Sequence, residues 1–381
     1  MIWAVLLGFL PLAIWLWLLV GQGLYWLTRE RDDQPLPPQD PSSWPTVIAV
    51  VPARNEADVI RRSIGSLLAQ DYPGPFRVVL VDDESDDGTA AAAAALTGAD
   101  RLAVMHAGKR PPGWTGKLWA VSQGVERAAA DRPDYLWLTD ADIAHAPETL
   151  RHLVARAEAG RLVLVSLMAK LHCATWAERF FIPAFVYFFK MLYPFAWVNH
   201  PRARTAAAAG GCMLVRREAL EAAGGIDRIR GAIIDDCALG RALKMQGPVW
   251  LGLTHRSVSI RPYAGVNEIR RMVARSAYAQ LGYSPWLLAG TLLGLALMFL
   301  APPAWTVLAP DMSWIAAALA WGLMAISLVP MLRFYGRSPL WGLALPAIGL
   351  LYASFTLDSA VQHWRGRGGM WKGRAQAMRQ A

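Results

Sequence analysis

Charged residues are scarce in this sequence. Only 18% of its 381 residues are charged and 55% are hydrophobic, whereas soluble domains average about 25% charged residues. No charged residue occurs between Ile2 and Thr28, and about 20 apolar residues are enough to span a bilayer. The run also lacks the basic start and the small-residue cleavage site of a secretory signal peptide. We therefore expect residues 1–28 to form an uncleaved transmembrane helix.

Cysteine is scarce as well. The chain has three cysteines, an odd number without a C-x-x-C pair: Cys173, Cys212 and Cys237. This pattern excludes a disulfide framework and the usual zinc spacing, and we expect small buried side chains in a reducing compartment. The histidines lack the helical spacing of metal ligands. We expect them, His145 included, to be ordinary core or surface residues.

The sequence contains no recognised nucleic-acid-binding motif, although its formal charge is +9 and its pI is near 9.7. It has no phosphate-binding P-loop either, because Pro111 and Leu118 stand where that motif needs Gly and Ser or Thr around Gly116-Lys117. Many Arg and Lys residues lie beside apolar segments, where they would meet anionic lipid headgroups. Membrane contact therefore explains the charge, and we expect no nucleic-acid partner.

The carboxyl-terminal part returns to long apolar runs. We expect membrane helices within 284–364, from the segments 285–310, 312–332 and 340–357, followed by a basic tail at 365–381. If the last segment spans, the arginines of the tail lie opposite a cytoplasmic catalytic domain, against the positive-inside rule. Two alternatives stay open: the last segment is re-entrant or interfacial, or the chain breaks the rule.

Between the apolar ends, the composition is that of a soluble domain behind a linker. Residues 29–45 are charged and contain five prolines, which predicts an extended tether. Residues 46–265 then form the expected domain. Short β-branched or apolar strands alternate there with helical periodicity, which predicts βαβ units and a mostly parallel sheet. We expect the strands and helices at 46–51, 57–68, 77–81, 89–96 and 135–138.

Two segments of the chain are predicted to lie at the membrane surface. Residues 176–198 hold ten aromatic residues and three charges, with Pro183 and Pro194 inside, and aromatic side chains favour the headgroup level. The alternative is a helix in the domain core. Residues 266–283 are basic and predict a second interfacial helix.

Acidic clusters follow the first two predicted strands, at the sheet edge where ligands bind in such folds. The sequence PARNE at 52–56 forms a turn that can present groups to a nucleotide base or ribose; helix capping by Asn55 is the simpler alternative. Five carboxylates then occur within the six residues 82–87. One carboxylate at a strand end can accept the imide proton of uracil, while Asp86 or Asp87 caps the next helix.

Two further carboxylate pairs carry the expected chemistry. Asp140 and Asp142 end the third predicted strand as a D-x-D, and an extended D-x-D points both carboxylates the same way, which suits a divalent cation on a diphosphate. Asp235 and Asp236 open a probable helix. An inverting sugar transfer needs one carboxylate to accept the proton of the acceptor hydroxyl, and a helix-starting acid is the alternative.

In this order, the motifs PARNE, VDDESDDGT, TGK, TDAD, GGCMLVRREAL and IDDCALGRAL resemble glycosyltransferase family 2. The resemblance covers about 46–262. It implies the GT-A fold, an α/β domain whose mixed sheet is flanked by helices and binds a nucleotide sugar. With its amino-terminal anchor and carboxyl-terminal apolar segments, the chain is most similar to hopanoid-biosynthesis-associated membrane glycosyltransferases, and more distantly to ceramide glucosyltransferases.

The resemblance implies a role for each matching residue. Asp82 and Asp83 would contact the uracil, and Glu56 would line the nucleotide pocket together with Pro52 and Arg54. Asp140 and Asp142 would hold Mg or Mn on the diphosphate, near Lys117. Asp236 would be the catalytic base, with Asp235 in the preceding acidic position, while the acceptor side is implied for Gly210, Gly211 and Cys212.

Two positions depart from the family pattern. The acidic pair is often Glu-Asp in the family and is Asp235-Asp236 here. Membrane members usually carry Q/R-x-x-R-W, whereas the segment 270–276 has arginines without the tryptophan. Arg271 or Arg275 can still clamp the diphosphate, as a pair one turn apart, and a basic helix facing headgroups is the alternative.

The sequence therefore predicts a membrane-bound inverting glycosyltransferase that moves a sugar from a nucleotide sugar, a UDP-sugar by resemblance, to a lipid from the bilayer. A hopanoid acceptor is implied by the resemblance alone. We expect it in the bacterial inner membrane, with the catalytic domain facing the cytoplasm. A polyprenyl-phosphate sugar transferase shares every donor motif, and a nonenzymatic membrane scaffold is the third hypothesis. A processive polysaccharide synthase would need more spanning helices and an intact Q-x-x-R-W.

Overall fold

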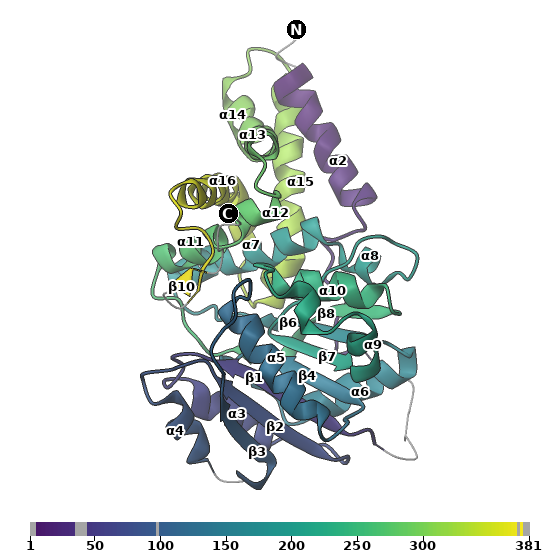
Figure 1. Ribbon diagram of the computed structural model, residues 1–381. Coiled ribbons are helices and arrows are strands. Elements are labelled where there is room, and N and C mark those ends of the chain that lie inside the picture. The colour runs from purple at the N-terminus through teal and green to yellow at the C-terminus, as the bar shows by residue number, and fades with distance from the viewer. Residues whose placement is uncertain (1–4, 35–43, 97–98, 372–373, 376–381) are drawn as a thin grey trace. The chain divides into compact units, whose positions relative to one another are not determined.

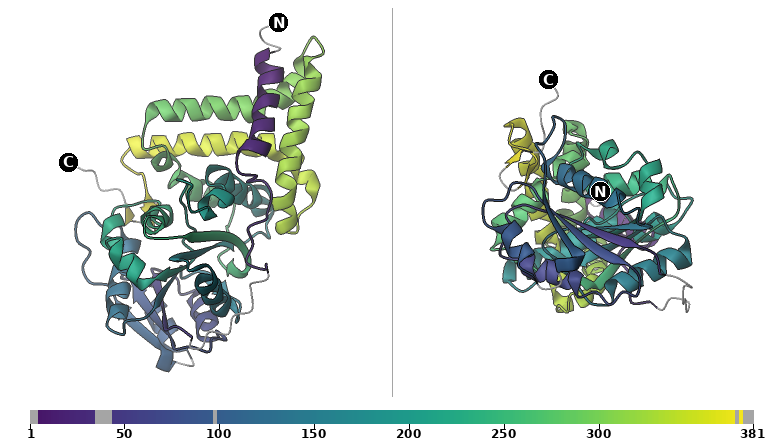
Figure 2. Two further views of the ribbon diagram at one scale, coloured as in Figure 1. Left: turned by 90° about the vertical axis from the view of Figure 1, so that its right-hand side faces the viewer. Right: turned by 60° about the horizontal axis from the view of Figure 1, so that its bottom comes forward.

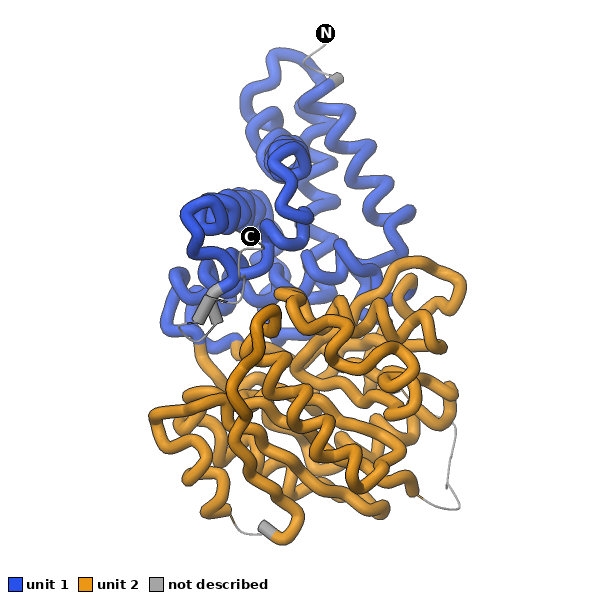
Figure 3. The backbone as a smooth tube through the Cα atoms, in the orientation of Figure 1, with its two compact units in different colours: residues 1–29, 173–196, 263–369 blue, residues 30–172, 197–262, 370–381 orange. Residues whose placement is uncertain are grey.

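The computed structural model describes residues 5–34, 44–96, 99–371 and 374–375. The chain divides into two compact units, shown in Figure 3. Unit 1 comprises residues 1–29, 173–196 and 263–369 and contains the apolar helices. Unit 2 comprises residues 30–172, 197–262 and 370–381 and contains the large sheet.

The sheet of unit 2 has eight strands and mixed directions (Figure 1). Its strands, in spatial order, are β3 (Leu102–His106), β2 (Phe76–Asp82), β1 (Val47–Ala53), β4 (Tyr135–Thr139), β7 (Cys212–Arg216), β6 (Leu164–Lys170), β8 (Val249–Ser259) and β5 (Ile143–His145). The first four are parallel, as the sequence predicts. β7 is antiparallel to both β4 and β6, and β5 is antiparallel to β8. The sheet is therefore mixed rather than mostly parallel.

Helices accompany the sheet strands along unit 2. They are α3 (Ile60–Leu68), α4 (Thr89–Ala94), η2 (Ala99–Arg101), α5 (Gly116–Ala129), α6 (Thr149–Gly160), α9 (Arg217–Ala222), η3 (Ile226–Ile229) and α10 (Asp235–Lys244), while α8 (Phe195–Asn199) lies where the two units meet in sequence. The first strands and helices occupy the segments that periodicity predicts. Two short strands, β9 (Met370–Trp371) and β10 (Arg374–Ala375), pair separately.

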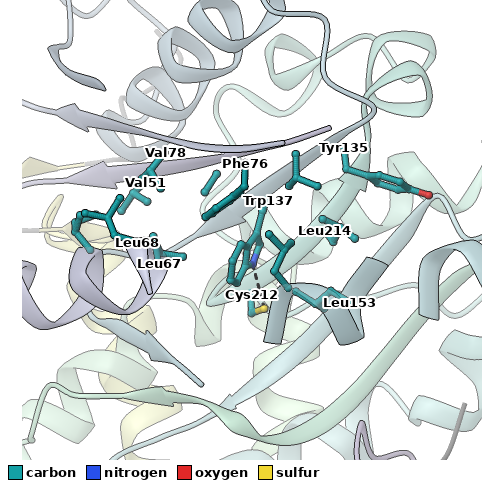
Figure 4. Packing of buried hydrophobic residues seen from close by; sticks show 14 of the residues in the cluster. Val51, Leu67, Leu68, Phe76, Val78, Tyr135, Trp137, Leu153, Cys212 and Leu214 are labelled. Carbon is teal, nitrogen blue, oxygen red and sulfur yellow. Dashed lines mark hydrogen bonds between the residues drawn. The ribbon is translucent and has the colours of Figure 1, made fainter. Parts of the chain in front are cut away.

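The core of unit 2 lies between the sheet and its helices (Figure 4). β1 is buried at every residue, as expected for a strand covered on both faces. Trp137 on β4 is fully buried and donates its indole N–H to the Sγ of Cys212 on β7 at 3.3 Å. Burial raises the pKa of the Cys212 thiol to about 12. The cysteine is thus a small core residue, as predicted, and it is unreactive at neutral pH.

Residues after the amino-terminal helix are attached to the sheet rather than extended. Arg31 forms a β-bridge with Leu253 of β8, and buried Asp32 accepts the hydroxyl of Thr254 at 2.6 Å. The predicted tether therefore does not begin at residue 29. Most of its prolines, at 35–43, lie outside the described residues.

Unit 1 is a set of apolar helices (Figure 2). They are η1 (Val5–Phe9), α2 (Leu10–Gly21), α7 (Trp176–Leu192), α11 (Val266–Ala274), α12 (Ala277–Gln280), α13 (Pro285–Leu295), η4 (Ala296–Leu300), α14 (Ala301–Leu308), α15 (Ser313–Phe334), η5 (Pro339–Ala344) and α16 (Leu345–Trp364). Three stretches are long and apolar enough to cross a membrane: Pro285–Leu308, Trp314–Phe334 and Pro339–Trp364.

The amino-terminal helix is shorter than predicted. It ends at Gly21, followed by turns, because Gly23 and Leu24 take positive φ angles of 62° and 51°. Trp15 is fully buried against Phe299 and donates its indole N–H to the carbonyl of Met298 at 2.9 Å. The helix is therefore packed within unit 1, and its first four residues lie outside the described part of the chain.

The aromatic segment is one continuous helix through Pro183. α7 begins with a capping box, in which the Thr175 hydroxyl accepts the N–H of Glu178 and the Glu178 carboxylate accepts the N–H of Thr175. It ends before Pro194. Glu178 and Lys190 are fully buried within unit 1, Lys190 donating to the carbonyl of Leu27 at 2.7 Å.

Candidate active site

The carboxyl ends of β1 and β2 lie side by side, with Ala53 in register with Asp82. This pairing brings the PARNE loop against the acidic cluster. The Arg54 guanidinium donates to the backbone carbonyls of Asp83 and Glu84 and lies 3.8 Å from the Asp83 carboxylate. Asp82 and Asp83 are each 2% exposed. The structure thus places these predicted nucleotide-pocket residues together.

The two loops are also joined through Asn55, whose φ of 51° is in the left-handed region that Asn tolerates. Its N–H donates to the Ser85 hydroxyl at 3.0 Å, and its side-chain oxygen accepts the N–H of Asp86 at 3.1 Å. Asp87 accepts the N–H of Thr89 at the start of α4, as predicted, and also that of Ala57. Asn55 therefore connects the loops instead of capping a helix.

Arg261, just after β8, contacts two predicted site residues. Its guanidinium forms an ion pair with Glu56, and its Nε lies 3.5 Å from the Asp142 carboxylate. The sequence analysis missed this residue. It belongs to none of the recognised motifs, and only the folded sheet brings residue 261 beside residues 56 and 142.

The D-x-D is not extended. β4 ends at Thr139, and Asp140 to Ile143 form a turn in which the N–H of Ile143 reaches the Asp140 carbonyl at 3.3 Å. The two carboxylates accordingly meet different cations, Lys117 for Asp140 and Arg261 for Asp142. The expected parallel orientation of the two side chains is wrong, although both lie at the end of the predicted strand.

Lys117 joins the D-x-D to the second carboxylate pair. α5 begins at Gly116, where the Thr115 hydroxyl accepts the N–H of Leu118. This start places the Lys117 Nζ 2.8 Å from Asp140 and 3.0 Å from Asp235. Burial lowers the pKa of Lys117, but the attraction of Asp140 and Asp235 outweighs burial and holds the pKa above its usual range. The side chain is a permanent cation between two carboxylates.

Asp236 is held by backbone donors at the start of α10. Its Oδ2 accepts the N–H of Gly210 at 3.1 Å, and its Oδ1 accepts the N–H of Cys237 at 2.7 Å. Burial and then the neighbouring Asp235 raise the pKa of Asp236 to about 6, against the lowering effect of Lys117 and of the two N–H donors. A carboxylate with this pKa is a stronger base than an ordinary aspartate and is still ionised at pH 7.

These groups surround an open cavity of about 340 Å³, part of it continuous with solvent. Polar groups from three predicted motifs line it: Lys117, Asp140, Gly210 and Asp235. Pro52 and several apolar side chains complete the lining. The cavity is therefore where a donor's charged group and a hydroxyl acceptor can meet the candidate base.

A buried histidine supports the floor of this site. His145 lies between the Ser257 hydroxyl and the Thr139 hydroxyl, each at 2.9 Å, and Thr139 donates onward to the carbonyl of Gly211 at 2.8 Å. Burial lowers the pKa of His145 to about 3. As expected, this histidine is a neutral core residue, and it connects the residue before Asp140 to the residue after Gly210.

Residues 48–224 match the sequence profile described as Glycosyl transferase family 2. The chain contains a glycosyl transferase family 2 domain. Its mixed sheet with flanking helices is a GT-A fold, as predicted. The matched segment includes β1 to β7, the PARNE loop, the acidic cluster, Lys117 and the D-x-D, whereas α10 with Asp235 and Asp236 lies beyond it. No curated protein sequence matches this chain.

Solved structures share the fold of this family 2 domain. The mannosyltransferase PcManGT from Pyrobaculum calidifontis, solved with GDP-Man and Mn2+, is 21% identical, with a TM-score of 0.53, over 94% of this chain and 99% of that chain. TarS from S. aureus with UDP is 12% identical, with a TM-score of 0.38, over 84% and 92%. Mannosyl-3-phosphoglycerate synthase from Rubrobacter xylanophilus is 18% identical, with a TM-score of 0.39, over 62% and 75%.

The donor set of the D-x-D fits a hard divalent cation. Asp140 and Asp142 offer carboxylate oxygens on side chains that are 33% and 26% exposed. Among the described residues, no group of three or more His, Cys, Asp or Glu side chains gathers to form a closed metal site. Mg²⁺ is typically held by one or two carboxylates plus substrate phosphates, so an open pair is the appropriate arrangement for a metal that arrives with a diphosphate.

Two predicted phosphate ligands lie in the other unit. Arg271 is on α11 and Arg275 directly follows it, within unit 1. The Arg271 Nε donates to the carbonyl of Asn267 in its own helix at 3.3 Å. The structure does not bring either arginine to the site of unit 2, and their contact with a diphosphate stays a prediction.

Proposed function

We propose that the protein is a membrane-bound, metal-dependent inverting glycosyltransferase that moves a sugar from a nucleotide sugar to a lipid acceptor. The observation that carries this proposal is the position of Asp236. It is a buried carboxylate of raised pKa, hydrogen-bonded by Gly210 and Cys237 beside the Lys117–Asp140 pair. A base, a fixed cation and an open carboxylate pair are the groups that sugar transfer from a diphosphate requires.

The reaction follows as a single displacement. The acceptor hydroxyl oxygen attacks the anomeric carbon and forms the new glycosidic bond while the bond from that carbon to the diphosphate oxygen breaks. Asp236 accepts the hydroxyl proton, and the nucleoside diphosphate leaves with its bonding electrons. Attack opposite the leaving group inverts the anomeric centre.

The charge on the leaving diphosphate is stabilised from two sides. Lys117 presents an ammonium group beside the cavity, where fixed charges act with little reorganisation. A Mg or Mn ion held by Asp140 and Asp142 would supply Lewis-acid stabilisation of the same oxygens. The Mn2+ and GDP-Man bound in the Pyrobaculum calidifontis structure agree with this metal and donor class.

The nucleotide is proposed to bind over the PARNE loop and the acidic cluster. Arg54, Asp82 and Asp83 are buried or nearly so at adjacent strand ends, and Glu56 is 7% exposed beside them. A UDP-sugar follows from the family resemblance. Arg261, between Glu56 and Asp142, is the residue we add to this pocket.

The acceptor is proposed to reach the enzyme from a bilayer. Three helical stretches are long and apolar enough to cross a membrane, so a hydrophobic acceptor would share the protein's own location. A hopanoid is the acceptor that the family resemblance implies. We place the protein in the bacterial inner membrane with unit 2 in the cytoplasm, where nucleotide sugars are made.

The test is release of nucleoside diphosphate by the detergent-purified chain from a panel of UDP- and GDP-sugars. Each donor is tested with Mn or EDTA, with and without hopanoid, polyprenyl phosphate or total bacterial lipid. Release from one donor that requires metal and one lipid supports the proposal and names both substrates. Release with polyprenyl phosphate alone would replace the hopanoid, whereas a folded protein silent on every donor would favour a scaffold.

A further inference from the structure

The carboxyl-terminal helix α16 packs against charged helices of unit 1. Arg270 on α11 forms an ion pair with Asp358 on α16, and Asp358 also accepts the side-chain amide of Gln362 at 3.2 Å. α11 has Glu268 and Arg271 in addition to Arg270. A helix with this charge density is costly in hydrocarbon, so α11 belongs at the water-facing level of a membrane.

Two further hydrogen bonds hold α16 at that level. The Ser359 hydroxyl accepts the N–H of Tyr278 at 3.0 Å and donates to the carbonyl of Ala274, at the end of α11. Nearer the start of α16, the Tyr352 hydroxyl donates to the carbonyl of Phe181 on α7 at 3.0 Å. α7 has buried Glu178 one turn earlier, and this carboxylate accepts the N–H of Tyr263 at 2.8 Å.

These contacts leave too little of α16 to cross a bilayer. From Tyr352 to Gln362 the helix is attached to α7, α11 and α12. The free part, residues 345–351, is about 10 Å long at 1.5 Å per residue. Even with η5, residues 339–351 reach about 20 Å, against a hydrocarbon core of about 30 Å.

The arrangement of unit 1 agrees with this length. In Figure 2, α16 and α13 run across the direction of α2 and α15. α15 ends at Phe334, past Ser327, whose hydroxyl lies 2.6 Å from the Tyr187 hydroxyl of α7. The segment between α15 and α16 therefore starts at the level of α7, the same helix that α16 contacts.

We propose that α16 does not span the membrane but lies in its plane, on a leaflet rich in anionic lipid. Its apolar residues Leu350, Leu357 and Trp364 are 49%, 43% and 56% exposed, and they face the acyl boundary. Arg365 and Arg367 are exposed directly after it, and they meet lipid phosphates. Residues 338 and 367 accordingly lie on one side of the membrane. The proposal concerns topology and stands whether or not the protein transfers sugar.

Cysteine labelling in sealed membrane vesicles tests this topology. Single variants Ser338→Cys, Arg367→Cys and Met312→Cys are made in a Cys173→Ser background, because Cys212 and Cys237 are buried. A membrane-impermeant maleimide is applied to right-side-out and to inverted vesicles. We expect positions 338 and 367 to label from the same side, and exposed Met312, between α14 and α15, to label from the other. Labelling of 338 and 367 from opposite sides overturns the proposal.

Reporter fusions to the unmutated full chain give an independent reading. A carboxyl-terminal green fluorescent protein fluoresces only in the cytoplasm, and a carboxyl-terminal alkaline phosphatase is active only outside it. A fusion truncated after Ser338 provides the reference side. The proposal expects the same reporter to be active after residue 338 and after residue 381; a switch of reporter between the two positions shows that α16 spans.

Discussion

At the scale of single residues, the chemistry depends on the protonation of Asp236. Its pKa is raised to about 6 by burial and by Asp235, and a general base acts only when it is deprotonated. We therefore predict that kcat/KM falls as the pH drops through about 6 and is independent of this group above about pH 7. Transfer rates at saturating metal, measured from pH 5 to 8, check the limb. Full activity at pH 5 would exclude Asp236 as the base.

Lys117 provides a second test of the same group. Its charge lowers the pKa of Asp236, so Lys117→Met should move the acid limb upward by about one pH unit and reduce kcat by about 10²-fold or more through loss of diphosphate stabilisation. Lys109→Met is the matched control, since Lys109 is exposed in the preceding loop. An unshifted limb in Lys117→Met would show that the two side chains are not coupled.

Sequence reasoning identified most of the site residues but not their geometry. The acids at 82–83, 140 and 235–236 were found because each follows an apolar strand or opens a helix, which is a local pattern. Arg261 has no local signal; it meets Glu56 and Asp142 only after β8 enters the sheet. The turn at Asp140 to Ile143 was missed because β5 follows immediately, and its pairing with β8 is a long-range contact.

At the scale of elements, α10 positions the base through a close approach. A Cβ at Gly240 would lie 2.8 Å from the backbone carbon of Ala207 and 2.9 Å from its oxygen, and backbone atoms cannot move aside cheaply. We predict that Gly240→Ala destabilises the fold by about 1–3 kcal/mol and lowers kcat, because α10 begins with Asp235 and Asp236.

Gly65→Ala on α3 is the control for this prediction. Nothing lies within 4 Å of a Cβ built at Gly65, so alanine should be neutral or stabilise the helix by up to about 1 kcal/mol. Thermal unfolding in detergent compares both variants with the parent chain. Equal melting temperatures for the two variants would contradict the packing account.

Elements with strong local patterns were the predictable ones. Residues 47–53 and 135–139 are continuous apolar strands, and residues 60–68 carry a clear helical stripe. The directions of β6, β7 and β8 could not be predicted, because they depend on pairing between segments up to about a hundred residues apart. α7 continues through Pro183, which sequence rules treat as a break, because this proline is buried within the packing of unit 1.

At the scale of the whole molecule, the apolar helices and the basic charge together predict an integral membrane protein. Three stretches are long enough to cross, and burial of such helices in lipid does not depend on salt. We predict that the chain stays in the membrane pellet through 1 M NaCl and alkaline carbonate and is released by detergent. Release by salt alone would mean that charge, and not the helices, attaches the protein.

The most direct test of the central claim compares Asp236→Asn with the parent chain in the sugar-transfer assay. Asparagine keeps the shape and can still accept the Gly210 N–H, but it cannot take a proton. We predict a loss of turnover of about 10²–10⁴-fold, a melting temperature that is unchanged or higher at pH 8 because no buried charge must be maintained, and unchanged donor binding. A variant that folds, binds donor and transfers sugar at the parent rate would contradict the proposed mechanism.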